Sequence, residues 1–128
     1  MRKLAVYINA TAQRAESFRE IQEDYDLDLK MLQDVRQRWN STYHMLVHGW
    51  RLQDALEEWM LNYKNSTLEA LELTDEEWIH VCYIIALCKP FAMWTYIYSL
   101  SSGSILHTAW EVYECLFNYL EDQCKKLQ

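Results

Sequence analysis

One stretch in the first third of the chain marks a change of local structure: Asp34-Val35-Arg36-Gln37-Arg38-Trp39-Asn40-Ser41-Thr42-Tyr43-His44-Met45-Leu46. Before it, polar and apolar residues alternate strictly from Asp24 to Leu29, which is typical of a half-buried strand. Within it, Asn40 and Ser41 are both good helix N-caps, because their side chains accept hydrogen bonds from free backbone N–H groups. The stretch therefore predicts the end of a short strand, the only strand candidate in the chain, and the start of a helix.

Helices are predicted on both sides of this stretch by apolar residues spaced three and four apart, as on one helix face. A capping box, Thr74 to Glu77, opens the third helix, and Pro90 is expected to kink it. Ser101 to Ser104 form the one clear loop signal. The expected helices cover residues 3–23, Asn40 or Ser41 to about 62, Thr74 to about Leu100, and Ile105 to about Lys126. The predicted fold class is mainly α, with four helices and at most one short strand.

The same spacing predicts which side chains face the core. In the second helix these are Met45, Leu46, Leu52, Leu56 and Trp59. In the last helix they are Ile105, Ala109, Val112, Leu116 and Leu120.

The composition excludes several other architectures. The chain has only 2 Gly and 1 Pro, too few for the tight turns of a hairpin-rich sandwich or barrel. It also lacks a Gly-rich phosphate loop. Hydrophobic residues make up 51% of the sequence, which excludes a wholly disordered chain.

The most apolar stretch runs from Ile79 to Leu100 and resembles a membrane span in length. Lys89 and Pro90 lie at its middle, where a lysine costs about 2.5–3.5 kcal/mol in a bilayer. A buried core helix is the preferred interpretation, and no membrane contact is expected.

The net charge of −7 argues against nucleic acid as a partner if the charge is spread evenly. It is not spread evenly. Residues 1–19 have a net charge of +3, and so do residues 35–51, which contain Arg36, Arg38 and Arg51 and no acidic residue. An anionic partner is therefore expected to meet the chain at these two basic stretches, of which residues 35–51 include the arginines of the stretch quoted above.

Two interpretations of this region follow from the residue types. Arg36 and Arg38 can bind phosphate, the face of Trp39 can stack an unpaired base, and the helix start at Asn40 and Ser41 offers N–H groups to an anion. Alternatively, Trp39 is a core residue and the arginines are a solvated face.

Other constellations give no chemical signature. His44 and His48 have the spacing of a zinc-binding pair, but no third ligand is evident nearby. Asp24, Asp26 and Asp28 imitate a calcium loop that then lacks its glycine and glutamate. No nucleophile motif occurs. We expect no metal site, cofactor or catalytic residue.

The block D-V-x-x-R-W-N-S-T-Y-x-M-L resembles the signature of hAT-superfamily transposases. Other segments are similar to fungal members of that superfamily, and together they cover nearly the whole chain. They are Ala5 to Ile8 with Arg14 and Phe18, Leu73 to Trp78, Lys89-Pro90-Phe91, and His107 to Glu121. Gln37 stands where the family usually has threonine.

The resemblance implies one partial domain, in which residues 1–39 end a ribonuclease H-like core and residues 40–128 belong to its helical insertion. The family cuts and joins DNA with three carboxylates that hold two divalent metal ions such as Mg²⁺. By the resemblance, these carboxylates lie outside this chain, so no enzymatic activity is expected. Arg38 and Trp39 are expected beside DNA, with Arg36 as a further candidate for phosphate contact. The implied location is the nucleus.

A different class of function is also open. Six Trp and nine Tyr suit a protein interface, and a helical insertion separated from its parent sheet exposes apolar faces. The alternative is therefore a helical interaction module without a DNA role, which self-associates through its exposed apolar helices.

Overall fold

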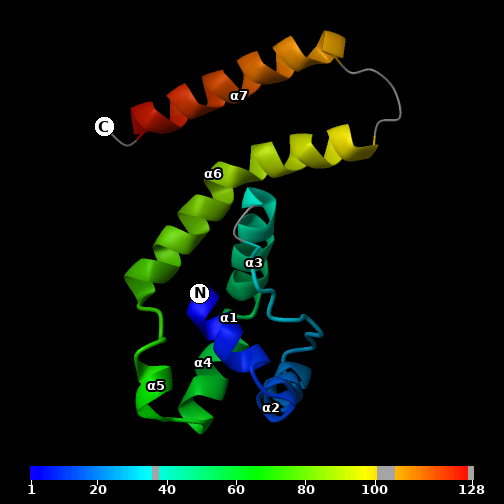
Figure 1. The fold of residues 1–128 in the computed structure, drawn as a ribbon. Coiled ribbons are helices and arrows are strands. Elements are labelled where there is room, and N and C mark those ends of the chain that lie inside the picture. Colours follow the sequence, from blue (N-terminus) through cyan, green and yellow to red (C-terminus); the bar gives the residue numbers. More distant parts are fainter. Residues whose placement is uncertain (36–37, 101–105, 127–128) are drawn as a thin grey trace. The chain divides into compact units, whose positions relative to one another are not determined.

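The computed structural model describes residues 1–35, 38–100 and 106–126, and all regular elements in these ranges are helices (Figure 1). The chain forms two compact units, Met1–Ile85 and Ala86–Gln128. The predicted mainly-α fold class is confirmed. The helices are α1 (Arg2–Asn9), α2 (Ala12–Glu23), α3 (Trp39–Arg51), α4 (Gln53–Asn62), α5 (Ser66–Glu69), α6 (Asp75–Leu100) and α7 (Leu106–Lys126).

Two of the predicted helices are each divided, and one short helix was not predicted. The first helix breaks after Asn9, and Thr11 then caps α2 by accepting a hydrogen bond from the Arg14 amide. The second breaks at Leu52, where ψ is 8° and the side chain is fully buried. The side chain of Asn65 caps the four-residue α5. Apolar periodicity continues across both breaks, so it gave no sign of them.

The predicted strand is not formed within the described residues. Asp24 to Asp26 are a turn after α2, and Asp26 adopts a φ of 52°. From Leu27 to Val35 the chain has no regular secondary structure, although Leu27, Leu29 and Met31 are more buried than the residues between them. The alternating pattern therefore predicted the inward side chains correctly. A β-strand also needs hydrogen bonds to a neighbouring strand, and no such strand is present among the described residues.

Trp59 of α4 is the centre of the core of unit Met1–Ile85. It is 1% exposed and makes edge-to-face contacts with Phe18 and Tyr7, with ring centroids 5.9 and 6.5 Å apart. Its indole N–H donates to Ser17 Oγ at 3.0 Å. All five residues predicted to face inward from the second helix are buried, which confirms that prediction.

In unit Ala86–Gln128, α7 buries Val112 and joins α6 through a hydrogen bond from Tyr119 Oη to the Ala86 carbonyl, 2.9 Å long. Pro90 lies inside α6 and has no N–H to donate to the carbonyl four residues before it, which is that of Ala86. The tyrosine hydroxyl supplies the missing donor.

The prediction for the inward residues of the last helix was right in part, because Val112 is buried and Leu116 is half-buried, but Ala109 and Leu120 are exposed. Ile105 lies outside the described residues, as does the loop Ser101 to Ser104. Within α6 only Trp78, Val81 and Ala92 are buried, so α6 is not the buried core helix expected. Among described residues α6 is the one helix long and apolar enough to cross a membrane by length and composition. The absence of membrane contact stays a prediction.

The packing of Trp59 leads to a stability prediction. Trp59→Ala removes a fully buried side chain and its hydrogen bond to Ser17, so we expect it to lower the free energy of unfolding by about 3–5 kcal/mol. The matched control is Trp50→Ala, because Trp50 is 47% exposed in the same unit and its loss should change stability by less than about 0.5 kcal/mol. Urea unfolding followed by circular dichroism measures both, and equal effects would contradict the assigned core.

Candidate nucleic-acid interface

The carboxylate of Asp34 fixes the approach to α3. Its side chain is 3% exposed and accepts two hydrogen bonds from the Arg2 guanidinium at the start of α1. Asp34 Oδ2 also accepts from the Thr42 hydroxyl in the first turns of α3, at 3.1 Å. These donors, Arg2 first, hold the pKa of Asp34 below its usual value. Arg2 lies 32 residues away in sequence, and no local pattern could have identified it as the partner.

Ser41 closes the turn that leads into the helix. Its Oγ accepts a hydrogen bond from the Val35 N–H at 2.7 Å. Around it, the Arg38 N–H donates to the Val35 carbonyl and the Ser41 N–H donates to the Arg38 carbonyl, both at 2.9 Å. The hydroxyl predicted to cap the helix or meet DNA is therefore used to hold the loop.

The helix begins at Trp39, with Arg38 as its N-cap, which corrects the predicted start at Asn40 or Ser41. No side chain caps this end, and its first turn contains no acidic residue. Backbone N–H groups in the first turn of a helix lack the usual helical partner, and of these the Ser41 N–H donates to the Arg38 carbonyl. The start of α3 thus carries a positive potential, and the Asp34 carboxylate lies beside it, bonded to Thr42.

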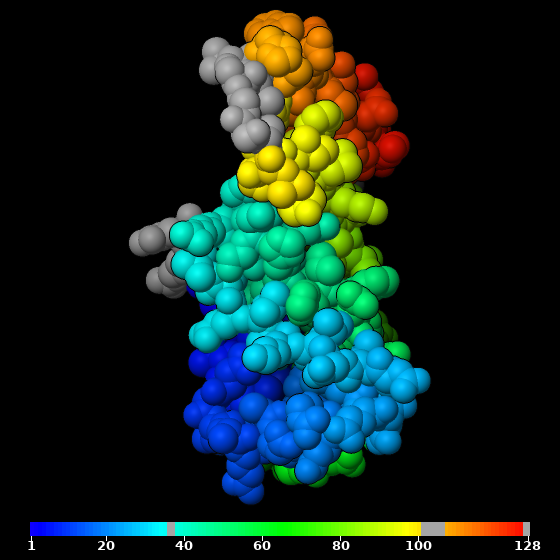
Figure 2. Space-filling view, turned by 90° about the vertical axis from the view of Figure 1, so that its right-hand side faces the viewer, coloured from blue at the N-terminus to red at the C-terminus, as the bar shows by residue number. Residues whose placement is uncertain are grey.

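Arg38 and Trp39 stand together at this end, and both are exposed. Figure 2 shows the cyan segment around the start of α3 on the surface of the molecule. Trp39 is 47% exposed, so its interpretation as a core residue is wrong. Arg36, the other predicted phosphate contact, lies outside the described residues. A cation, an accessible indole face and an uncapped helix start therefore adjoin one another.

Asn40 adds an unusual feature to this end of the helix. Its side-chain oxygen is buried and has no hydrogen-bond partner among the described residues. An unsatisfied buried acceptor costs about 1–3 kcal/mol. We call Arg38, Trp39 and Asn40 the α3-start surface.

The two histidines considered as metal ligands, His44 and His48, do not meet a third ligand in the described part of the structure. Nδ1 of His48 lies 3.2 Å from the Lys30 carbonyl, and the His44 ring lies against Tyr43 with centroids 5.4 Å apart. Across residues 1–35, 38–100 and 106–126, no three His, Cys, Asp or Glu side chains gather closely enough to hold a metal ion.

The sequence matches the model of one known protein family. The family model of the ZBED1 RNase-like helical domain matches residues 1–87. The chain belongs to this family. The match ends close to Ile85, where the first compact unit of this ZBED1-type helical domain also ends.

A protein from Talaromyces stipitatus, named "Putative transcriptional regulator tpeD", is 38% identical over 127 residues. That alignment covers 99% of this ZBED1-type chain but 14% of the relative. No solved structure matches the chain.

The lowered pKa of Asp34 predicts how stability depends on pH. A carboxylate whose pKa falls on folding stabilises the protein above its unfolded pKa of about 3.9, and this contribution is lost as the pH falls through the folded value. Asp34→Asn should therefore destabilise the fold clearly at pH 7, with unfolding curves that converge on wild type below about pH 4. Asp28→Asn, at an exposed position, is the control. A pH-independent difference would exclude this role for the ion pair.

Proposed function

We propose that the chain is a hAT-type, transposase-derived piece that contacts DNA weakly through the α3-start surface and does not cut it. The observation that carries the proposal is the exposed Arg38–Trp39 pair at an uncapped helix start. The family match and the fungal relative support a hAT-related origin. The proposal includes location in the nucleus and no cofactor of the chain's own, and the divalent metal belongs to the catalytic carboxylates of the parent family.

Each group on this surface suits a different part of a nucleic acid. The guanidinium of Arg38 and the N–H groups of the first turn suit a phosphate. The face of Trp39 suits an unpaired base, because stacking needs no particular base edge. The combination favours distorted or single-stranded DNA over a regular duplex.

The charge of the chain sets the strength of this contact. The overall charge is −7, and the basic residues 35–51 are the part that meets the DNA. Phosphate contacts release counterions, so an interaction with one or two phosphates is weak and depends modestly on salt. Weak binding is therefore what this surface supports.

The decisive experiment uses fluorescence anisotropy of a labelled DNA hairpin with one unpaired base. The double variant Arg38→Ala with Trp39→Ala should weaken binding roughly tenfold or more, because it removes a stacking platform and a phosphate contact. It should also reduce the slope of log K against log salt by about 1. A fully paired hairpin should bind less tightly and respond less to the loss of Trp39.

The opposite end of the same helix provides the control. Trp50 is 47% exposed, as Trp39 is, and it is followed by the exposed Arg51. Trp50→Ala with Arg51→Ala therefore removes the same residue types and charge, and should leave hairpin binding unchanged. If both double variants bind as wild type does, or both weaken equally, the α3-start surface is not a DNA-binding site.

An aromatic stripe on α7 favours a second candidate function, self-association. Trp110, Tyr113 and Phe117 are 69, 61 and 50% exposed, and Leu120 continues the line. Neighbouring rings stack with centroids 6.0 and 6.2 Å apart. The four residues are three, four and three positions apart, so the spacing reads the same from either end of the helix. Two antiparallel copies of α7 would therefore set Trp110 against Leu120 and Tyr113 against Phe117.

This second function predicts a concentration-dependent dimer. Trp110→Ser with Phe117→Ser should raise the dimer dissociation constant at least about tenfold, since aromatic residues dominate such contacts. Sedimentation velocity over a concentration series measures it. Trp50→Ser with Leu61→Ser removes exposed apolar residues from the other unit and should have no effect. A wild-type chain that stays monomeric at high concentration would rule out this function.

A further inference from the structure

The first basic stretch, residues 1–19, has no part in the DNA contact proposed above, and one of its arginines lines a small cavity. This cavity has a volume of about 280 Å³ and lies between α1, α2, the end of α4 and α5, all within one compact unit. Its aromatic walls are formed by Tyr7, Trp59 and Tyr63. Among the described residues, Arg14 is the one charged side chain that lines it.

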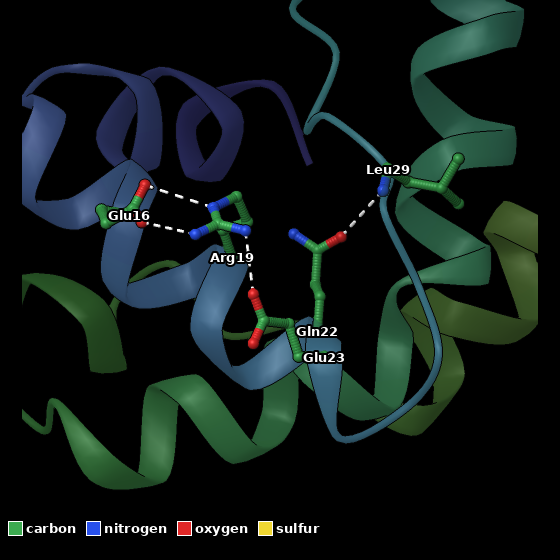
Figure 3. A network of polar contacts seen from close by, with 5 residues as sticks. All are labelled: Glu16, Arg19, Gln22, Glu23 and Leu29. Atoms are coloured by element: carbon green, nitrogen blue, oxygen red, sulfur yellow. Dashed lines mark hydrogen bonds and ion pairs between the residues drawn. The ribbon is translucent and has the colours of Figure 1, made fainter.

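Arg14 lacks the acidic partner that the other arginines of this stretch have. Arg19, five residues further along α2, is paired with Glu16 and Glu23 at 2.6 and 2.8 Å (Figure 3). Arg2 is bonded to the buried carboxylate described above. Arg14 forms no ion pair with any residue that the structure describes. The chain has 19 acidic residues against 12 basic ones, so this is not the result of a shortage of acids.

The guanidinium of Arg14 is nevertheless held in a defined position. Its central carbon lies 4.0 Å from the centroid of the Tyr7 ring, and Nη1 donates to the Tyr7 carbonyl at 3.3 Å. The face of the ring attracts the cation, and the carbonyl fixes its orientation. A guanidinium has five N–H donors, and those beyond this one bond have no acceptor among the described residues. A cation positioned in advance loses less freedom when it binds an anion.

The hydroxyl of Tyr7 provides a second donor at the same ring. Its oxygen accepts a hydrogen bond from Asn65 Nδ2 at 3.2 Å, and Asn65 is itself fixed because its Oδ1 caps α5. The proton of the hydroxyl has no acceptor in the described part of the chain. The guanidinium lies over the face of the ring and the hydroxyl lies at its edge. One oxyanion can therefore accept hydrogen bonds from both groups.

The rest of the lining determines what else the ligand contains. Ser17 adds no free donor, because its Oγ donates to the Arg14 carbonyl and accepts from the Trp59 indole N–H, both at 3.0 Å. Tyr63 is exposed and packs on Trp59 with ring centroids 5.3 Å apart, so it offers a flat apolar surface. The volume is just below the range of about 300–1,000 Å³ found for drug-sized ligands, so the ligand is small.

We propose that this cavity binds a small organic anion, in which a carboxylate or phosphate group is carried on a flat apolar body. The anionic group accepts hydrogen bonds from the Arg14 guanidinium and the Tyr7 hydroxyl. The body lies against the ring of Tyr63. A cationic ligand does not fit, because the face of Tyr7 already holds a cation. The site shares no residue with the α3-start surface.

The test uses the complete chain and three phenyl compounds: phenylacetate, phenyl phosphate and the uncharged phenylacetamide. In titrations followed by heteronuclear NMR, the anions should give saturable shifts of the Arg14 Nε–H and the Trp59 indole N–H. Phenylacetamide should bind at least about tenfold more weakly than phenylacetate, because hydrogen bonds to a charged acceptor are stronger than those to a neutral one. The tighter of the two anions shows whether the site prefers a carboxylate or a phosphate.

Variants with matched controls place the binding in the cavity. Arg14→Gln should weaken phenylacetate binding about tenfold or more, whereas Arg51→Gln, at an exposed position of the same unit outside the cavity, should not. Arg14→Lys keeps the charge but not the planar fork, so it should restore binding only in part. Tyr7→Phe removes one of the two donors and should weaken binding several-fold, and Tyr43→Phe, also outside the cavity, should have no effect.

Three results would overturn the proposal: neither anion shifts the two signals, phenylacetamide binds as tightly as phenylacetate, or Arg14→Gln binds normally while folded by circular dichroism. The comparison of the charged with the uncharged probe uses only the wild-type chain, so it decides the question even where a variant does not fold. Arg14→Gln should leave binding of the DNA hairpin unchanged. The anion site and the DNA contact are therefore tested separately, and neither result decides the other.

Discussion

The buried carboxylate of Asp34 is the constraint on which the arrangement of unit Met1–Ile85 depends. It joins the start of α1, through Arg2, to the first turns of α3, through Thr42. A carboxylate at 3% exposure must be compensated, because its desolvation is costly without donors. The loop between these contacts is thereby held at both ends, and Arg38 and Trp39 follow directly from it. The exposed pair owes its position to a residue that is itself inaccessible.

A second physical theme is that side chains repeatedly supply partners that the backbone lacks. Gln22 and Asn9 bond to the segment of residues 28–33 as a neighbouring strand would. Ser41 satisfies the Val35 N–H before α3. In the other unit, Tyr119 donates to the carbonyl that Pro90 leaves without its helical N–H. An all-helical fold can in this way contain a strand-like segment, because buried backbone groups need a partner but not a particular kind of partner.

The sequence predicted those features that depend on near neighbours. The inward residues of the second helix were correct from Met45 to Trp59, and the Thr74–Glu77 capping box forms with both reciprocal hydrogen bonds. The breaks at Thr11 and Leu52 were missed because they interrupt the backbone without interrupting the apolar pattern. The exposure of Trp39 could not be decided from its own residue type, since a tryptophan at a helix start suits a core or a binding surface equally. The partnership of Arg2 with Asp34 depends on tertiary folding.

The exposed aromatic residues divide between the two units, and this division separates the proposed functions. Trp39 belongs to the part of the chain that the ZBED1-type family model covers, residues 1–87, whereas Trp110, Tyr113 and Phe117 lie beyond it. Burying an aromatic side chain in a core normally satisfies its large apolar surface, as Trp59 does. An aromatic stripe left in solvent gains that stabilisation only from another molecule. The proposed contact with DNA near α3 and the proposed contact with protein along α7 therefore use different residues, so we expect that either can be lost without loss of the other.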